Sequence, residues 1–233
     1  MFTVPEWGDK PLSELTSKDL YKIFLMTNIP DIKTKPYWVD NLGVELIDWD
    51  IWISVNLVNI LIPRKTRDFN WKILHRLVNS GAKLKLMNLS DGFCKRCQGQ
   101  NIENLQHLLF SCIENTKLWH VIQASCQEYL GSSITLDKKL ALTGLWQSGI
   151  TTEMLVTNMI LSITRHQIWK IRCKTWYGGK TISTNHSLRI LKNSLLDHIQ
   201  ILVSSSSSQA DLIVHLDRLE TTIKKIDVNS LHN

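Results

Sequence analysis

The sequence predicts a mainly α-helical protein, and three observations lead to this prediction. Strand-type alternation of apolar and polar residues is weak throughout the chain. Apolar residues instead recur at helical spacing in most segments. Breaks fall at Pro63, Gly131 and the pair Gly178-Gly179. The length of 233 residues and a hydrophobic content of 43% are sufficient for a sizeable core.

The N-terminal third is expected to hold two amphipathic helices. The first lies in the stretch LSELTSKDLYKIFLMTN. The second has Leu46, Trp49, Ile53 and Leu57 at roughly helical spacing and ends before Pro63.

A third helix is predicted over residues 66–78. Phe69, Ile73 and Leu77 recur at i, i+4 and i+8 and are expected to face the interior. Gly81 follows in the position that a C′ glycine takes, so it is expected to end this helix.

Four further helices are expected downstream. One lies in NTKLWHVIQASCQEYLG and stops at Gly131, and a long one covers residues 151–180, apolar in its first half and basic in its second. The last two cover 186–203 and 209–226. The serine run at 204–208 is a flexible linker by composition.

Positive charge is concentrated in two segments of the chain. The formal net charge is +6. Residues 64–96 hold nine basic residues against Asp68 and Asp91, a balance of +7, and residues 165–180 hold five basic residues and no acid, a balance of +5. Such clustering is typical of a surface that binds a polyanion rather than of general solubility.

Four metal-ligating residue types fall inside the nineteen-residue stretch CKRCQGQNIENLQHLLFSC. They have the spacing C-x2-C-x9-H-x4-C and are Cys94, Cys97, His107 and Cys112. Thiolate and imidazole are the ligands that Zn²⁺ takes in closed tetrahedral sites, which are structural rather than catalytic. Gly92 and Gly99 allow the sharp turn with which two neighbouring cysteines chelate one ion. The pattern therefore predicts a structural zinc site.

The spacing of the second pair limits its geometry. Five residues of ideal helix rotate by about 500°, which leaves His107 and Cys112 about 140° apart. A helix that begins near Asn104 must therefore loosen or end near Cys112 if both side chains bind one ion. The alternative interpretation is that these two residues belong to the core and that Cys94 and Cys97 are ordinary thiols.

The remaining cysteines and His120 have no comparable pairing. Cys126 and Cys173 are interpreted as structural residues, and His120 is at most a distant substitute ligand. No stretch approaches the ~20 apolar residues of a membrane span, and the N-terminus does not have the form of a secretory signal. We therefore expect an intracellular protein, with no membrane partner, whose cysteines are thiols or metal ligands.

The motif lies within a longer pattern. A helix with aromatic-x-x-K-x-L-H-R precedes it, followed by a leucine-containing connection, C-x2-C, E-x-L-x-H-L-x-x-x-C and a tryptophan. The residues in this pattern are Lys72, Leu74, His75, Arg76, Leu84, Cys94, Cys97, Glu103, Leu105, His107, Leu108, Cys112 and Trp119. Residues 67–119 thus resemble the zinc-binding region of reverse transcriptases from LINE-type (non-LTR) retrotransposons. RHQIWKIRCKTW is similar to the downstream IW-x-x-R helix of that family, although Cys173 stands where asparagine commonly follows the arginine.

This resemblance implies the C-terminal region of a multifunctional protein, after an endonuclease and a polymerase. It implies binding of the element's own RNA or of target nucleic acid, as a ribonucleoprotein in the nucleus or cytoplasm. Asp48 and Asp50 lack the hairpin context of a polymerase aspartate pair, and the endonuclease residues are absent too. We therefore expect no catalytic residues and no small-molecule substrate. The expected cofactor is Zn²⁺, and the expected partners are RNA or single-stranded DNA and the polymerase region of a parent protein.

The fold class is then an irregular helical domain with an embedded CCHC zinc loop. Its expected organisation is a helical segment (1–63), the zinc-binding region (64–131), a helical extension with a basic aromatic helix (132–203), the serine linker (204–208) and a C-terminal helix (209–233).

Nucleic acid is expected to contact the two basic segments. Lys95 and Arg96, held between two ligands, are the first candidates for phosphate contact, and Trp176 and Tyr177 are the candidates for base stacking. The full predicted set is Arg64, Lys65, Arg67, Lys72, His75, Arg76, Lys83, Lys85, Lys95, Arg96, Lys170, Arg172, Lys174, Trp176 and Tyr177.

Other functions remain open at this point. A tryptophan-rich N-terminal third with a charge balance of −4 over residues 1–63 is compatible with a protein-interaction or scaffolding module, and the chain is also compatible with an inactive transposon relic. An independent enzyme is not expected, because a closed four-ligand site has no open coordination position and no nucleophile–base pair is recognised.

Overall fold

The computed structural model describes residues 16, 34–43, 49–144, 149–179, 181–205 and 209–228. These residues are largely helical and contain no β-strand, apart from an isolated antiparallel bridge between Phe93 and Ile102. The mainly α-helical class is therefore confirmed. The helix expected in LSELTSKDLYKIFLMTN lies outside the described residues except for Thr16.

The described helices follow one another along the chain with short connections. In order they are α2 (Lys35–Leu42), α3 (Trp49–Ile53), the π-helix η3 (Ser54–Val58), α4 (Arg64–Leu74), α5 (Gly81–Leu86), the π-helix η4 (His107–Ser111), α6 (Ile113–Leu130), α7 (Lys138–Thr143), α8 (Thr152–Gly178), α9 (Thr184–Ser205) and α10 (Ala210–Lys224).

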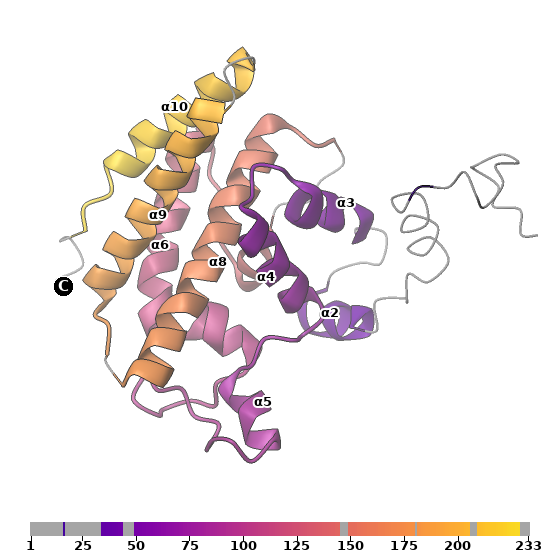
Figure 1. Ribbon diagram of the computed structural model, residues 1–233, viewed down its shortest axis with the longest axis vertical. Helices are drawn as coiled ribbons and strands as arrows, with labels where there is room; N and C mark the ends of the chain where they lie inside the picture. The colour runs from indigo at the N-terminus through magenta and orange to yellow at the C-terminus, as the bar shows by residue number, and fades with distance from the viewer. Residues whose placement is uncertain are drawn as a thin grey trace, which may run out of the picture.

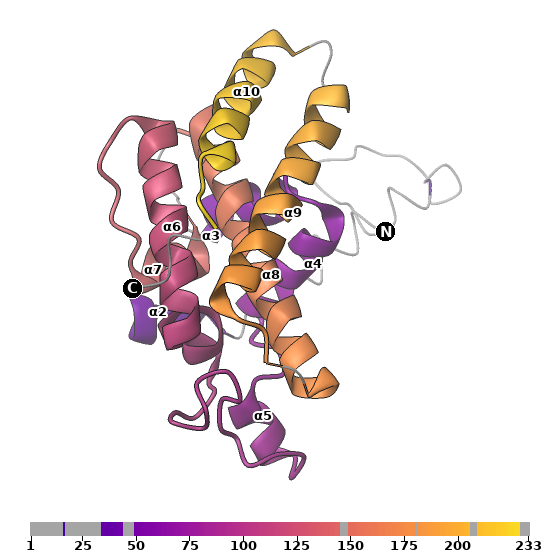
Figure 2. The same ribbon diagram turned by 90° about the vertical axis from the view of Figure 1, so that its left-hand side faces the viewer.

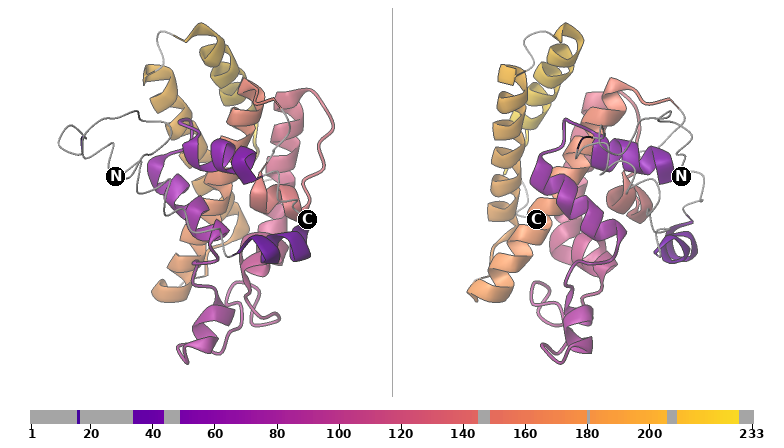
Figure 3. Two further views of the ribbon diagram at one scale, coloured as in Figure 1. Left: turned by 90° about the vertical axis from the view of Figure 1, so that its right-hand side faces the viewer. Right: turned by 45° about the vertical axis from the view of Figure 1, so that its right-hand side comes forward.

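Helix α8 occupies the centre of the molecule. The pair α9 and α10 lies on one side of it and α3 and α4 lie on the other (Figures 1 and 3). One apolar core runs through these layers and includes side chains from Trp38 to Ile226. Helix α5 and the loop that follows it extend from one end of this helical body (Figures 1 and 2). The zinc motif thus lies at the junction between the body and this extension.

The ends of several helices confirm the sequence prediction. Helix α6 ends at Leu130, and Gly131 takes a left-handed φ of 64°. Helix α8 ends at Gly178, and Gly179 also has a φ of 64°. The expected C-terminal helices correspond to α9 and α10. Ser204 and Ser205 complete α9, while residues 206–208 of the serine run lie outside the described residues.

The predicted end of the third helix is wrong. Helix α4 stops at Leu74, Arg76 takes a left-handed φ of 54°, and Leu77 is 45% exposed instead of facing the interior. Gly81 is the first residue of α5, where Ser80 caps the helix by accepting a hydrogen bond from the Lys83 N–H.

Close backbone packing explains the glycine at position 81. A Cβ there would lie 2.8 Å from the Gly92 carbonyl oxygen and 3.0 Å from Cβ of Glu103. Gly81 is therefore needed for the approach of two loops and not for a helix end.

The first half of α8 buries a cation. Arg165 is fully buried, although the sequence analysis counted it within a basic surface segment. Its Nη2 donates to Asn56 Oδ1, Asn70 Oδ1 and Ser162 Oγ at 2.9, 3.3 and 2.8 Å, and Nη1 donates to the Ala141 carbonyl at 3.1 Å. Burial lowers the pKa of Arg165 to about 9. These bonds tie η3, α4 and α7 to α8.

Within the described ranges, every helix is too short or too polar to cross a lipid bilayer.

Candidate metal centre

The four residues of the CCHC motif converge in space. The ligand atoms of Cys94, Cys97, His107 and Cys112 all lie within 4.8 Å of one another, and all four side chains are buried. Sγ of Cys94 is 3.9 Å from Sγ of Cys112, and Sγ of Cys97 is 3.5 Å from Nε2 of His107.

These separations fit a tetrahedral zinc ion. With Zn–S bonds of about 2.3 Å and Zn–N bonds of about 2.0–2.1 Å, tetrahedral angles separate two sulfurs by about 3.8 Å and a sulfur from a nitrogen by about 3.6 Å. Three thiols and one imidazole are also the donor types that zinc prefers. The residues therefore fit a closed structural site, in which four protein ligands leave no position for a substrate.

A tight turn positions the first two ligands. The Cys94 N–H donates to the Asn101 carbonyl at 2.8 Å, next to the Phe93–Ile102 bridge, and the Gly99 N–H donates to the Cys94 carbonyl at 2.9 Å. Gly99 closes the turn with a φ of 76°, a conformation that costs a glycine little.

A π-helix positions the other two ligands. Over η4 the Cys112 N–H donates to the His107 carbonyl at 3.0 Å, an i→i+5 bond that widens the helix. Asn104 Oδ1 accepts from the His107 N–H at 2.7 Å, and Cys112 leaves the helix with extended dihedrals. The predicted loosening of the helix near Cys112 is thus found, and its cause is a change of helix type.

Protons are unequally shared among the clustered thiols. The hydrogen bond with Cys112, and then burial, raise the pKa of Cys94 to about 12, while that same bond lowers the pKa of Cys112. A cation bound among these sulfurs would displace such protons, since thiolates are the metal ligands.

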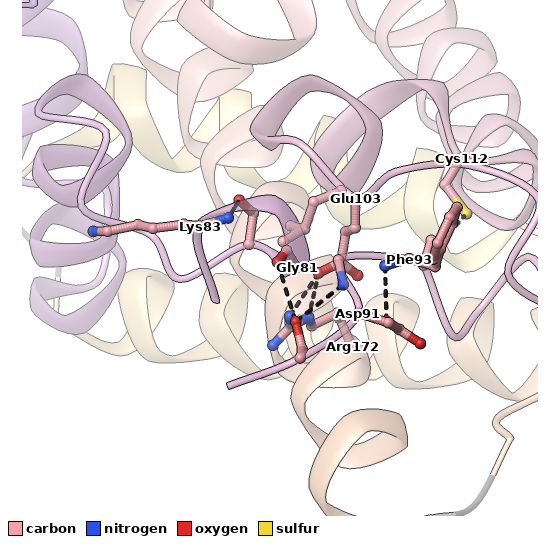
Figure 4. A network of polar contacts seen from close by, with 12 residues as sticks. Gly81, Lys83, Asp91, Phe93, Glu103, Cys112 and Arg172 are labelled. Atoms are coloured by element: carbon pink, nitrogen blue, oxygen red, sulfur yellow. Dashed lines mark hydrogen bonds and ion pairs between the residues drawn. The ribbon is translucent and has the colours of Figure 1, made fainter. Parts of the chain in front are cut away.

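Glu103 fastens the loop between the two ligand pairs (Figure 4). Its Oε1 accepts from the Gly81 N–H at 2.8 Å and from the Arg172 guanidinium, whose Nη2 lies at 2.6 Å and Nε at 3.0 Å. Both charged side chains are almost fully buried. One carboxylate therefore joins the zinc loop to α5 and to α8.

Two predicted nucleic-acid contacts are wrong, because their side chains are buried. Arg172 is 1% exposed and pairs with Glu103, and Arg96 is 7% exposed and donates through Nη1 to Asn115 Oδ1. Trp176 is half-buried, with the Lys95 ammonium 4.5 Å and the Arg172 guanidinium 4.0 Å from its ring centroid. Its ring therefore packs against cations of the protein instead of presenting a free face for base stacking.

The other predicted contact residues lie at or near the surface. Half-buried are Arg67, His75 and Lys83; exposed are Arg64, Lys65, Lys72, Arg76, Lys85, Lys95, Lys170, Lys174 and Tyr177. Asn115 was missed by the sequence analysis. Its buried amide donates to the Leu108 carbonyl at 2.7 Å and accepts from Arg96. The only sequence signal was its position three residues after a ligand, in the first turn of a helix.

The fold and the site define a structural CCHC zinc module within an α-helical protein. Residues 16–119 match the family described as "zinc-binding in reverse transcriptase". This part of the chain is thus a reverse-transcriptase zinc-binding region of retrotransposon type, and the resemblance drawn from the sequence is confirmed.

A relative in Xenopus laevis, the "Transposon TX1 uncharacterized 149 kDa protein", is 27% identical over 135 residues. The matched part covers 58% of this chain and 10% of that protein, so the chain corresponds to a small part of its relative. No solved structure matches the chain.

Proposed function

We propose that this chain is a zinc-stabilised nucleic-acid-binding module, with RNA or single-stranded DNA as its partner, and that it has no polymerase or nuclease activity of its own. In this proposal Cys94, Cys97, His107 and Cys112 hold Zn²⁺ as a structural ion. The ion fixes the zinc loop against α8 and takes no part in chemistry. The matched family, a zinc-binding region and not a catalytic domain, is compatible with this role.

The observation that carries the proposal is the meeting of the two basic segments. Helices α4 and α8 pack together (Figure 3). They place Lys65 and Lys72 in the same neighbourhood as Lys170, about a hundred residues later in the sequence. Burial, and then the nearby Lys170, Lys72 and Lys65, lower the pKa of His166 to about 4.

This α4–α8 cationic face lacks anionic partners of its own. Burial, then Lys65 and Lys174, lower the pKa of Lys170. In the described part of the chain, none of Lys65, Lys72, Lys170 and Lys174 forms an ion pair. Mutual repulsion among unpaired cations is relieved by a polyanion, and phosphate contacts supply most of the affinity in non-specific nucleic-acid binding.

The start of α4 adds to this preference for anions. Its first turn carries Arg64, Lys65 and Arg67 with no acid, and the N-cap, Pro63, provides no side-chain acceptor. Cations at a helix N-terminus oppose the helix dipole. Phosphate groups would relieve both effects.

Titration of a fluorescent single-stranded RNA, followed by anisotropy at several salt concentrations, tests the proposal. Lys65→Ala and Lys170→Ala should each weaken binding and reduce the slope of log K against log salt by about 0.7–1. Lys117→Ala, which removes an exposed cation from α6, should change neither. Absence of binding at low salt by the zinc-loaded protein would refute the proposal.

A further inference from the structure

The turn between the first two zinc ligands contains a buried cation. Arg96 is 7% exposed, whereas the adjacent Lys95 is exposed. Nη1 of Arg96 has an acceptor in Asn115, but Nη2 is buried and has no hydrogen-bond partner among the described residues. Leaving a buried charged donor unpaired costs about 1–3 kcal/mol or more. This guanidinium therefore calls for a further anionic acceptor.

The metal centre carries the complementary charge. Three thiolates and a neutral imidazole around Zn²⁺ have a net charge of −1, and Cys94, Cys97, His107 and Cys112 are all buried. An anionic centre taken out of water is unfavourable unless a nearby cation balances it.

The other acids near Arg96 have partners of their own. Glu103 is paired with Arg172, and Oε2 of Glu114 accepts from Thr184 Oγ1 at 2.6 Å. Burial lowers the pKa of Arg96, and Cys112 is the strongest of the anionic groups that act in the opposite direction. The thiolate cluster is thus close enough to interact electrostatically with the guanidinium.

We propose that Arg96 is the counter-charge of the zinc centre: its guanidinium supplies a positive charge and its unpaired N–H to the thiolate ligands. This role replaces the phosphate contact expected from the sequence. The inference rests on the zinc site alone and is independent of nucleic-acid binding. It also explains why Asn115 is buried beside the site, since its side-chain oxygen orients the guanidinium.

An external anion is the competing explanation for the unpaired Nη2. Arg96 also lines a hollow of about 340 Å³ together with Lys95, Glu114 and Thr184. An anion in this hollow would meet the Glu114 carboxylate, which disfavours it. Inorganic phosphate separates the two explanations in the experiment below.

The test is zinc affinity, measured by competition with a chromophoric chelator. Arg96→Met should weaken zinc binding by about 10–100-fold, as is typical for partners of metal ligands. Arg96→Lys, which keeps the charge, should recover part of this loss. Lys95→Met removes the same charge from an exposed side chain of the same turn and should stay within about threefold of the unmodified protein.

Three results would overturn the inference. One is zinc affinity of Arg96→Met within about threefold of the unmodified protein, and another is an equal loss in Lys95→Met. The third is a rise in melting temperature with 10 mM inorganic phosphate that requires Arg96, which would indicate an external anion. If Arg96→Met does not fold with excess zinc, Arg96→Gln replaces it, and the inference then requires Arg96→Lys to bind zinc more tightly than Arg96→Gln.

Discussion

Arg172 on α8 and Glu103 in the zinc loop form a buried ion pair, with Nη2 2.6 Å from Oε1, across 69 residues of sequence. Sequence reasoning placed this arginine on a nucleic-acid surface. Its burial shows instead that the basic end of α8 serves partly to hold the loop. The ring of Trp176 completes this contact between Arg172 and Lys95.

Neutralising Glu103 should therefore destabilise the protein strongly. Glu103→Gln keeps the shape of the side chain but leaves Arg172 as an uncompensated buried charge, at a cost of about 3–5 kcal/mol. The free energy of unfolding of the zinc-loaded protein, measured in denaturant, checks this. Glu128→Gln is the matched control, since the Glu128–Lys225 pair is exposed and should contribute at most about 1 kcal/mol. Equal losses in the two variants would contradict a structural role for the buried pair.

Zinc should bind with a stoichiometry of one ion per chain. Cys97→Ser should abolish tight binding, and removal of zinc by a chelator should lower the melting temperature of the unmodified protein, because binding of the ion stabilises the folded state. Cys173→Ser removes a half-buried thiol outside the cluster and should retain the full metal content. Metal analysis of the purified variants measures this. Equal zinc content in Cys97→Ser and Cys173→Ser would exclude the assigned ligand set.

Acid should remove stability through His166. Its pKa is lowered to about 4 in the folded protein, mainly by burial, whereas 6.5 is the unperturbed value. The unfolded chain therefore binds more protons between these values, and stability is lost as the pH falls from about 6.5 towards 4.

His166→Gln should remove this component of the pH dependence. At pH 7 the variant loses the stacking on Phe69 and the 2.9 Å hydrogen bond with Thr66. Its deficit in unfolding free energy should narrow as the pH falls, whereas protonation of the zinc ligands affects both proteins alike. A deficit that stays constant from pH 7 to pH 4.5 would rule out a depressed pKa.

Two glycines with left-handed φ values should respond differently to alanine. At Gly144, with a φ of 81°, a Cβ would lie 2.2 Å from Asn158 Oδ1, so Gly144→Ala adds a clash of about 1–3 kcal/mol to the backbone strain. At Gly149, with a φ of 88°, the Cβ would meet open space, and only strain of about 1–2 kcal/mol is expected. Thermal and denaturant unfolding compare the two. A larger loss in Gly149→Ala would contradict the close packing around Gly144.

Local signals made much of this fold predictable. The end of α6 at Gly131 and the end of α8 before Gly179 follow from the preference of glycine for left-handed φ. The metal cluster was predictable because ligand spacing constrains geometry, and the constraint on His107 and Cys112 required a loosened helix.

The errors came from contacts between distant segments. Gly81 looks like a helix end, but its backbone packs against Gly92, which sequence periodicity cannot reveal. Arg165 and Arg172 look like solvent-exposed cations on a basic helix, but buried acceptors from other helices surround them. Net charge therefore overstated the binding surface.

Helix α8 is a single rod of 27 residues, about 40 Å long. Met159 and Ile160 near its start lie in the core, and Arg172 near its end grips the zinc loop. No joint along this rod could absorb a displacement at either end. A ligand that pushes on the loop would therefore tilt the rod as a whole, and the strain would be felt in the interior of the helical body.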